Sequence, residues 1–168
     1  DSDRMAALVE ASAYRLVDDP ADADVVVLNT CSFIQTATEE SIATAFELAG
    51  EWTPAREGRK LVVAGCMPSR YGADLAEAMP EADAFLPVAE EHRLPEVLEG
   101  LLGVPFGRRA DAPTRTAGAR TAYLKVSEGC DRTCAYCTIP AIRGAFVSAP
   151  LADVLAEARF LIDAGALE

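Results

Sequence analysis

Three apolar segments divide the first 104 residues, and a helical pattern follows each of them. The segments at 25–28, 60–64 and 84–88 are largely apolar and rich in β-branched residues, which is typical of strands buried on both faces of a parallel sheet. The third is the weakest prediction, because Pro87 cannot donate a hydrogen bond to a neighbouring strand. Alternating strands and helices predict an α/β fold with an open parallel sheet and right-handed crossovers.

Apolar positions three and four residues apart set the helix predictions. We expect helices at residues 2–12, 36–51, 69–79 and 94–102. In the second of these, Ile42, Phe46 and Ala49 are expected to face the core, with glutamates on the opposite side. Residues 13–17 are predicted to form a further short strand.

The composition changes after residue 104, which predicts two units. Residues 1–104 form the amino-terminal parallel-sheet domain. Residues 105–120 contain prolines, glycines and arginines, and are expected to be a linker with a solvated basic face. Residues 121–168 begin a second unit, with a strand at 122–126 and a helix at 151–164. One strand and one helix cannot enclose a core, so this unit is expected to be part of a larger domain or to pack against the first.

The charge of the chain narrows the class of partner. Asp and Glu number 27 and Lys and Arg number 15, so the formal net charge is −12. An acidic chain is a poor general binder of phosphate backbones, whose affinity comes from lysines and arginines, and it suits a basic partner instead. No apolar run approaches the roughly 18 residues of a membrane span, and no signal peptide is visible. We therefore expect a cytoplasmic protein without membrane contact.

Three of the five cysteines lie close together on one predicted loop. They are Cys130, Cys134 and Cys137, spaced C-x3-C-x2-C, and three thiolates on one short loop can converge on a single metal site. A structural zinc site would need a fourth ligand from elsewhere, and free or disulfide-bonded thiols are a further alternative. A [4Fe–4S] cluster held by three thiolates instead leaves one iron open to a substrate or cofactor.

The two remaining cysteines, Cys31 and Cys66, each lie just past a predicted parallel strand. Both strands are followed by helices, so both cysteines are expected at the same edge of the sheet, where α/β sheets bind ligands. Neighbouring strands lie about 4.8 Å apart, so the two thiols could share a metal. Two buried structural cysteines or a catalytic disulfide pair are the alternatives.

The loop with the three clustered cysteines resembles the cluster-binding loop of the radical S-adenosylmethionine enzymes. The resemblance implies that Cys130, Cys134 and Cys137 hold a [4Fe–4S] cluster whose open iron binds S-adenosylmethionine. An electron from that cluster then yields the 5′-deoxyadenosyl radical. Tyr136 matches the aromatic residue that lies near the adenine. Arg143 is a candidate cofactor contact, and its alternative role is an ion pair with a carboxylate.

Further segments, at 29–42, 65–66 and 127–144, are similar to the methylthiotransferase branch of that family. The resemblance implies a second [4Fe–4S] cluster, which handles the sulfur to be inserted. Its ligands would be Cys31, Cys66 and a third cysteine preceding Asp1. By the same resemblance, the second unit is the first strand, loop and helix of the partial barrel that forms the radical domain.

Two substrate classes compete within this branch. One set of enzymes modifies the β-carbon of an aspartate in small-subunit ribosomal protein twelve, and the other modifies an adenosine of transfer RNA. The segments at 30–34 and 137–144 are more like the ribosomal-protein enzymes, and the acidic balance favours a basic protein substrate.

The same resemblance implies a flavodoxin- or ferredoxin-type reductant. The family's first amino-terminal cysteine and most of the radical domain lie outside this chain, so we expect it to be inactive by itself. A non-catalytic iron–sulfur or zinc-binding module is the alternative from a different class.

Overall fold

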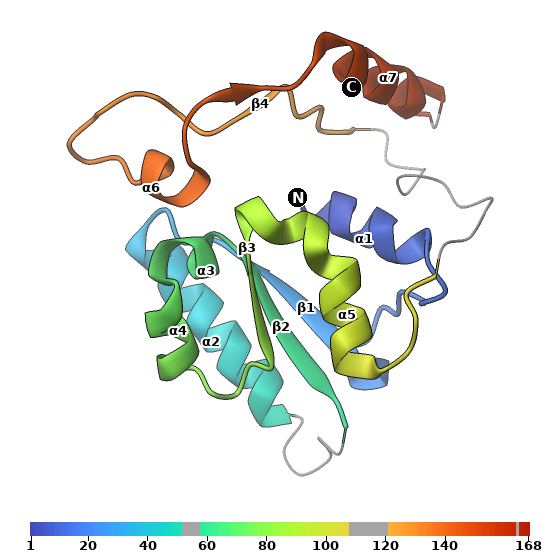
Figure 1. Cartoon of the computed structure of the whole chain (residues 1–168), viewed down its shortest axis with the longest axis vertical. Helices are drawn as coiled ribbons and strands as arrows, with labels where there is room; N and C mark the ends of the chain where they lie inside the picture. Colours follow the sequence, from blue (N-terminus) through green and yellow to red (C-terminus); the bar gives the residue numbers. More distant parts are fainter. Residues whose placement is uncertain (52–57, 108–120, 164) are drawn as a thin grey trace.

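The protein is described here by a computed structural model, whose described residues are 1–51, 58–107, 121–163 and 165–168 (Figure 1). Its elements, with η marking 3₁₀ helices, are α1 (Ser2–Glu10), η1 (Pro20–Asp22), β1 (Val25–Thr30), α2 (Gln35–Glu51), β2 (Lys60–Gly65), α3 (Cys66–Tyr71), α4 (Ala73–Ala78), β3 (Ala84–Pro87), η2 (Val88–Arg93), α5 (Leu94–Leu102), β4 (Ser127–Glu128), α6 (Ile139–Arg143), β5 (Val147–Ser148) and α7 (Leu151–Asp163).

The predicted parallel sheet is confirmed. Strands β1, β2 and β3 lie side by side in that order and all run parallel, so β2 is the central strand. Helices α2, α3 and α4 pack on one face of the sheet, and α1 and α5 pack on the other (Figure 1). The result is a three-layer α/β arrangement.

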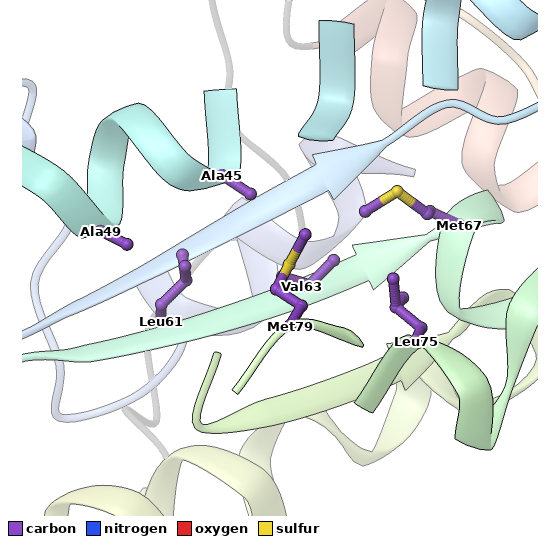
Figure 2. Close-up of a cluster of buried hydrophobic side chains, with 7 residues drawn as sticks. All are labelled: Ala45, Ala49, Leu61, Val63, Met67, Leu75 and Met79. Carbon is purple, nitrogen blue, oxygen red and sulfur yellow. The ribbon is translucent and has the colours of Figure 1, made fainter. Parts of the chain in front are cut away.

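The central strand is buried on both faces because its side chains alternate between two cores. Leu61 and Val63 face the core under α2, α3 and α4 (Figure 2), whereas Val62 and Ala64 face the core under α1 and α5. All four side chains are completely buried. Burying a leucine or valine contributes about 1.5–3 kcal/mol, so β2 carries a large part of the stability of the sheet.

Residues 13–17 do not form the predicted strand. The segment instead makes isolated contacts with the chain beyond α5. The Ala13 N–H donates to the Phe106 carbonyl at 2.9 Å, and the Tyr14 hydroxyl donates to the Val104 carbonyl at 2.5 Å. The Tyr14 and Phe106 rings meet edge to face, with centroids 5.3 Å apart. These contacts hold the segment against the end of α5 without a strand ladder.

Two helix predictions are also wrong in part. The helix predicted at 69–79 begins earlier, at Cys66, and is divided into α3 and α4 by Gly72, whose φ is 53°. Phe46 of α2 does not face the core and is 44% exposed. Ala49 is buried as predicted and Ile42 packs partly buried against the same core, but Ala45, and not Phe46, fills the buried position between them.

The second unit differs from prediction in its strand. Residues 122–126 form none, and pairing begins at β4, where Ser127 and Glu128 lie opposite Ser148 and Val147 of β5. The predicted helix at 151–164 is α7; residue 164 and positions 108–120 of the predicted linker lie outside the described residues. The division into two domains stays a prediction. No described helix is long and apolar enough to cross a membrane.

Candidate functional site

Cys31 and Cys66, here called the sheet-edge site, lie at the same edge of the parallel sheet, as predicted. The register pairs Thr30 of β1 with Gly65 of β2, so each cysteine is the residue that follows a paired position. Cys66 begins α3 and is 2% exposed, whereas Cys31 is exposed. Parallel pairing therefore brings the two cysteine-bearing turns together, with one thiol facing the protein and one facing solvent.

Hydroxyl groups hold the turn that carries Cys31. The Ser41 hydroxyl donates to the Cys31 carbonyl at 3.0 Å and accepts from the Cys31 N–H at 3.3 Å. The Thr30 hydroxyl donates to the Ala64 carbonyl at 2.6 Å and accepts from the Met67 N–H at 3.3 Å. Both hydroxyl-bearing side chains are buried. Sequence reasoning did not identify Thr30 and Ser41 as positioning residues, although they lie within the segment at 29–42 that carries the resemblance.

The backbone before Cys66 requires glycine. Gly65 has a φ of 94°, and a Cβ at this position would lie 2.4 Å from the Asn29 side-chain oxygen and 2.7 Å from the Thr30 carbonyl oxygen. Any side chain would therefore be strained and would force the two strand ends apart. This conformation turns the chain from β2 directly into α3, with Cys66 as its first residue.

A second glycine precedes the first clustered cysteine and has the same property. Gly129 has a φ of 74°, and a Cβ there would lie 2.1 Å from the Ala145 carbonyl oxygen. The Cys130 N–H donates to the Gly144 carbonyl at 3.1 Å. The two ends of the segment between Gly129 and Ala145 therefore lie in contact, which closes it into a compact loop.

The cysteine loop, residues 129–138, presents its thiols near the surface. Cys134 is exposed, and Cys130 and Cys137 are half-buried. The Arg132 N–H lies 3.4 Å from the Cys130 sulfur and donates to it, and the Cys137 N–H donates to the Cys134 carbonyl at 3.1 Å. The backbone therefore turns so that the Arg132 N–H group faces the Cys130 sulfur.

The five cysteines match an iron–sulfur cluster in donor type, because thiolates are the usual ligands of such clusters. In the described part of the chain, however, no three or more His, Cys, Asp or Glu side chains are grouped so that they could hold a metal ion. Ligation by the five cysteines therefore stays a prediction.

Four charged side chains, here called the ionic junction, connect the second unit to the start of the chain. They are Asp1, Lys125, Glu128 and Arg143. Asp1 accepts from Lys125 and from Arg143, each at 2.8 Å. Arg143 also lies 3.1 Å from Glu128, and Lys125 pairs with Glu128 as well. The carboxylates and cations alternate, so each charge has two opposite neighbours.

Arg143 extends beyond the ionic junction to the sheet-edge site. Its Nη2 lies 3.4 Å from the Cys66 sulfur, and its guanidinium carbon lies 5.6 Å from the centre of the Phe33 ring. Its Nε is buried and has no hydrogen-bond partner. The ion pair that the sequence offered as the alternative role of Arg143 is thus present. The predicted contact with a cofactor stays a prediction.

Burial and neighbouring charges shift the pKa values of side chains around the ionic junction in different directions. Burial acts to raise the pKa of Glu128, but Lys125 and Arg143 outweigh it and lower that pKa below its usual value. Burial raises the pKa of Glu91, and these cations offset it only in part. Burial acts to lower the pKa of Arg143, but Cys66 and Glu128 outweigh it and raise that pKa above its usual value. Arg143 therefore stays charged.

Tyr136 stands apart from these contacts. Its side chain is 89% exposed on the cysteine loop. The ring is therefore accessible to a ligand from solvent. Its predicted position beside an adenine stays a prediction.

Comparison with known proteins identifies a family and several relatives that the chain resembles. Residues 1–87 match the uncharacterized protein family UPF0004. Over its whole length the chain is 41% identical to the ribosomal protein uS12 methylthiotransferase RimO of Syntrophus aciditrophicus, and 43% and 37% identical to the proteins of that name from Anaeromyxobacter sp. (strain Fw109-5) and Nocardioides sp.. It spans 40%, 37% and 42% of their respective lengths.

The resemblance to methylthiotransferases, and to the branch that acts on a ribosomal protein, is thereby confirmed. Because the family match covers more than half of its residues, the chain belongs to the uncharacterized protein family UPF0004.

Proposed function

We propose that this chain is part of a radical S-adenosylmethionine methylthiotransferase that adds a methylthio group to the β-carbon of an aspartate in small-subunit ribosomal protein twelve. The chain spans about 40% of the length of its relatives, so the complete activity belongs to the full-length protein. The names of the relatives support the reaction and the ribosomal-protein substrate. The two clusters and the aspartate come from the motif resemblance.

The observation that carries this proposal is the contact between the two cysteine-bearing regions. Cys31 and Cys66 follow paired positions at one sheet edge. Arg143, six residues beyond Cys137, lies 3.4 Å from the Cys66 sulfur. A reaction that inserts sulfur after radical formation needs both sites to act on one substrate. The packing of α6 against α3 supports that requirement.

In this proposal the cysteine loop holds the first cluster through Cys130, Cys134 and Cys137. When bound, that cluster supplies a low-potential electron that cleaves the sulfonium bond of S-adenosylmethionine. Tyr136 lies on the exposed surface of the loop, where its ring can cover the adenine of the cofactor. Gly129 closes the loop against residue 145 and so fixes the backbone position just before Cys130, the first of the three cysteines.

Cys31 and Cys66 hold the second cluster, and the resemblance supplies a third ligand from residues preceding Asp1. Ser41 orients the Cys31 backbone, and Gly65 orients the start of α3. The exposed Cys31 side leaves that site open to substrate, while the buried Cys66 thiol anchors it.

The remaining partners follow from the same proposal. A flavodoxin- or ferredoxin-type protein supplies the electron, and the reaction takes place in the cytoplasm, where thiols stay reduced. The net charge of −12 favours a basic ribosomal protein as substrate over transfer RNA.

Anaerobic reconstitution of the full-length protein with iron and sulfide tests the cofactor chemistry. We expect the unsubstituted protein to take up two clusters. The triple variant, which combines Cys130→Ala, Cys134→Ala and Cys137→Ala, should take up one. With S-adenosylmethionine and a strong reductant, the unsubstituted protein should release 5′-deoxyadenosine and the triple variant should not. Uptake of one zinc without sulfide would instead support the non-catalytic zinc-binding module.

The substrate needs a separate experiment. Mass spectrometry of ribosomal proteins and transfer RNA from a deletion strain should show loss of the methylthio group from small-subunit ribosomal protein twelve. Its loss from transfer RNA alone would contradict the proposed substrate and favour the adenosine-modifying branch.

A further inference from the structure

Arg143 contacts both turns of the sheet-edge site, although it belongs to the segment that follows the cysteine loop. Its Nη2 lies 3.4 Å from the sulfur of Cys66, which is 2% exposed. Its guanidinium also lies 5.6 Å from the ring centre of Phe33, two residues beyond Cys31. A single side chain therefore connects α6 with both cysteine-bearing turns.

The ionic junction restricts the direction in which this guanidinium points. Nη1 donates to Asp1 at 2.8 Å and to Glu128 at 3.1 Å. With Nη1 held by two carboxylates, Nη2 is directed at the sulfur. A planar guanidinium can serve both groups at once, because its donors lie in a fixed fork, whereas an ammonium group cannot reproduce that geometry.

A positive donor beside a ligating sulfur has a known electronic consequence. Hydrogen bonds to the sulfurs and the net charge nearby set the reduction potential of an iron–sulfur cluster, and such outer contacts tune the metal site as well as orient its ligands. Arginine stays protonated throughout the range in which proteins fold. Its charge would therefore stabilise the reduced, more negative form of a cluster that Cys66 ligates.

We propose that Arg143 is a positioning residue of the sheet-edge site. It holds α6 against α3 through the Cys66 sulfur, and it raises the reduction potential of the cluster bound there. The inference rests on the proposed function, because it takes Cys66 as a cluster ligand. It assigns Arg143 to the sulfur-bearing cluster and not to S-adenosylmethionine.

The test uses the full-length protein with Cys130→Ala, Cys134→Ala and Cys137→Ala, which leaves the sheet-edge cluster as the one observed. A redox titration monitored by electron paramagnetic resonance gives its potential. Arg143→Gln removes the charge at similar size, and Arg143→Lys keeps the charge but loses the fork. Arg132→Gln is the matched control, because it removes the same charge from an exposed side chain of the cysteine loop.

We expect Arg143→Gln to shift the potential downwards, Arg143→Lys to shift it less, and Arg132→Gln to leave it nearly unchanged. An unchanged potential in Arg143→Gln would overturn the inference, and so would an equal shift in Arg132→Gln, which indicates a general charge effect. Absence of a sheet-edge cluster from the reference protein would overturn it too.

A cluster-free measurement covers the case in which Arg143→Gln weakens the fold. Hydrogen exchange of the full-length protein without iron should show α6 losing protection in Arg143→Gln and in Cys66→Ala, with the double variant losing no more than either alone. Additive losses would mean that the two side chains do not act through each other, which would contradict the positioning role.

Release of 5′-deoxyadenosine by the full-length protein with no cysteine replaced separates the two proposals. Release without a potential shift in Arg143→Gln leaves the proposed function standing and removes this inference. A potential shift without release keeps the role of Arg143 at the sheet edge and removes the radical reaction.

Discussion

The sheet region, residues 1–104, and the second region, residues 121–168, are stabilised by different forces. The sheet region buries apolar side chains on both faces of β2. Among the described residues of the second region, the buried apolar side chains are Ile142 and Leu161. That region exposes many large apolar side chains instead, including those of Tyr123, Tyr136 and Leu151.

The second region is joined to the first through charged contacts and through the packing of α6 against α3. The charged contacts are the ionic junction, whose side chains are partly exposed, and the contact of Arg143 with the buried Cys66 sulfur. Ion pairs that solvent reaches contribute little stability individually, whereas full burial of one large apolar side chain contributes about 1.5–3 kcal/mol. Substitutions should therefore have much larger effects in the sheet than at the junction.

The largest effect is expected from Leu61→Ala in the central strand. Leu61 is completely buried between the sheet and α2, so the substitution removes apolar contacts and leaves a cavity. We expect a loss of about 2–5 kcal/mol in the free energy of unfolding, measured by urea denaturation. Leu151→Ala is the control, because Leu151 is 72% exposed; an equal loss there would contradict the contrast between the regions.

A smaller but still large effect is expected from Gly65→Ala. The added Cβ would lie 2.4 Å from Asn29 Oδ1 at a φ of 94°, so we expect a loss of about 1–3 kcal/mol from backbone strain. Gly100→Ala in α5 has open space around it and should stabilise by about 0.5–1 kcal/mol. Thermal unfolding of both variants measures the difference, and similar midpoints would refute the requirement for glycine before Cys66.

At the junction, Glu128→Gln should have a modest, pH-dependent effect. The pKa of Glu128 is lowered in the folded protein, so its stabilisation is present above the unfolded value of about 4.3 and is lost as pH falls through the folded pKa. We expect the variant to be less stable by under about 1 kcal/mol at pH 7, and equal to the unsubstituted protein in strong acid.

Unfolding curves at several pH values, with Glu40→Gln on the exposed side of α2 as control, measure this dependence. A difference between Glu128→Gln and the unsubstituted protein that persists at low pH would show that lost packing, and not lost charge, causes the effect.

The smallest effect is expected from Glu91→Gln, and it should have the opposite sign. Burial raises the pKa of Glu91, so the folded protein loses stability as pH rises from the unfolded value through the raised one. The substitution removes that penalty and should stabilise at pH 7 by within about 0.5 kcal/mol. Destabilisation at pH 7 in the same unfolding series would mean that the Glu91 carboxylate makes a favourable contact.

The sheet and its cysteine edge were predictable because they depend on local pattern and on one topological rule. Apolar runs locate the strands, and parallel order then places Cys31 and Cys66 at one edge. The ionic junction was not predictable, because Asp1 and Arg143 are 142 residues apart and neither carries a local signal of its partner. The position of β4 depends likewise on pairing with β5, so the apolar segment at 122–126 predicted it too early.

The in-register pairing of β1 and β2 has a consequence for how the chain tolerates changes in length. Extra residues in the connection between α2 and β2 would leave Thr30 opposite Gly65. One residue inserted within β2 would rotate every following side chain to the other face of the sheet. Natural insertions and deletions should therefore occur in that connection. The ends of β1 and β2, which Cys31 and Cys66 follow, should keep a constant length and register.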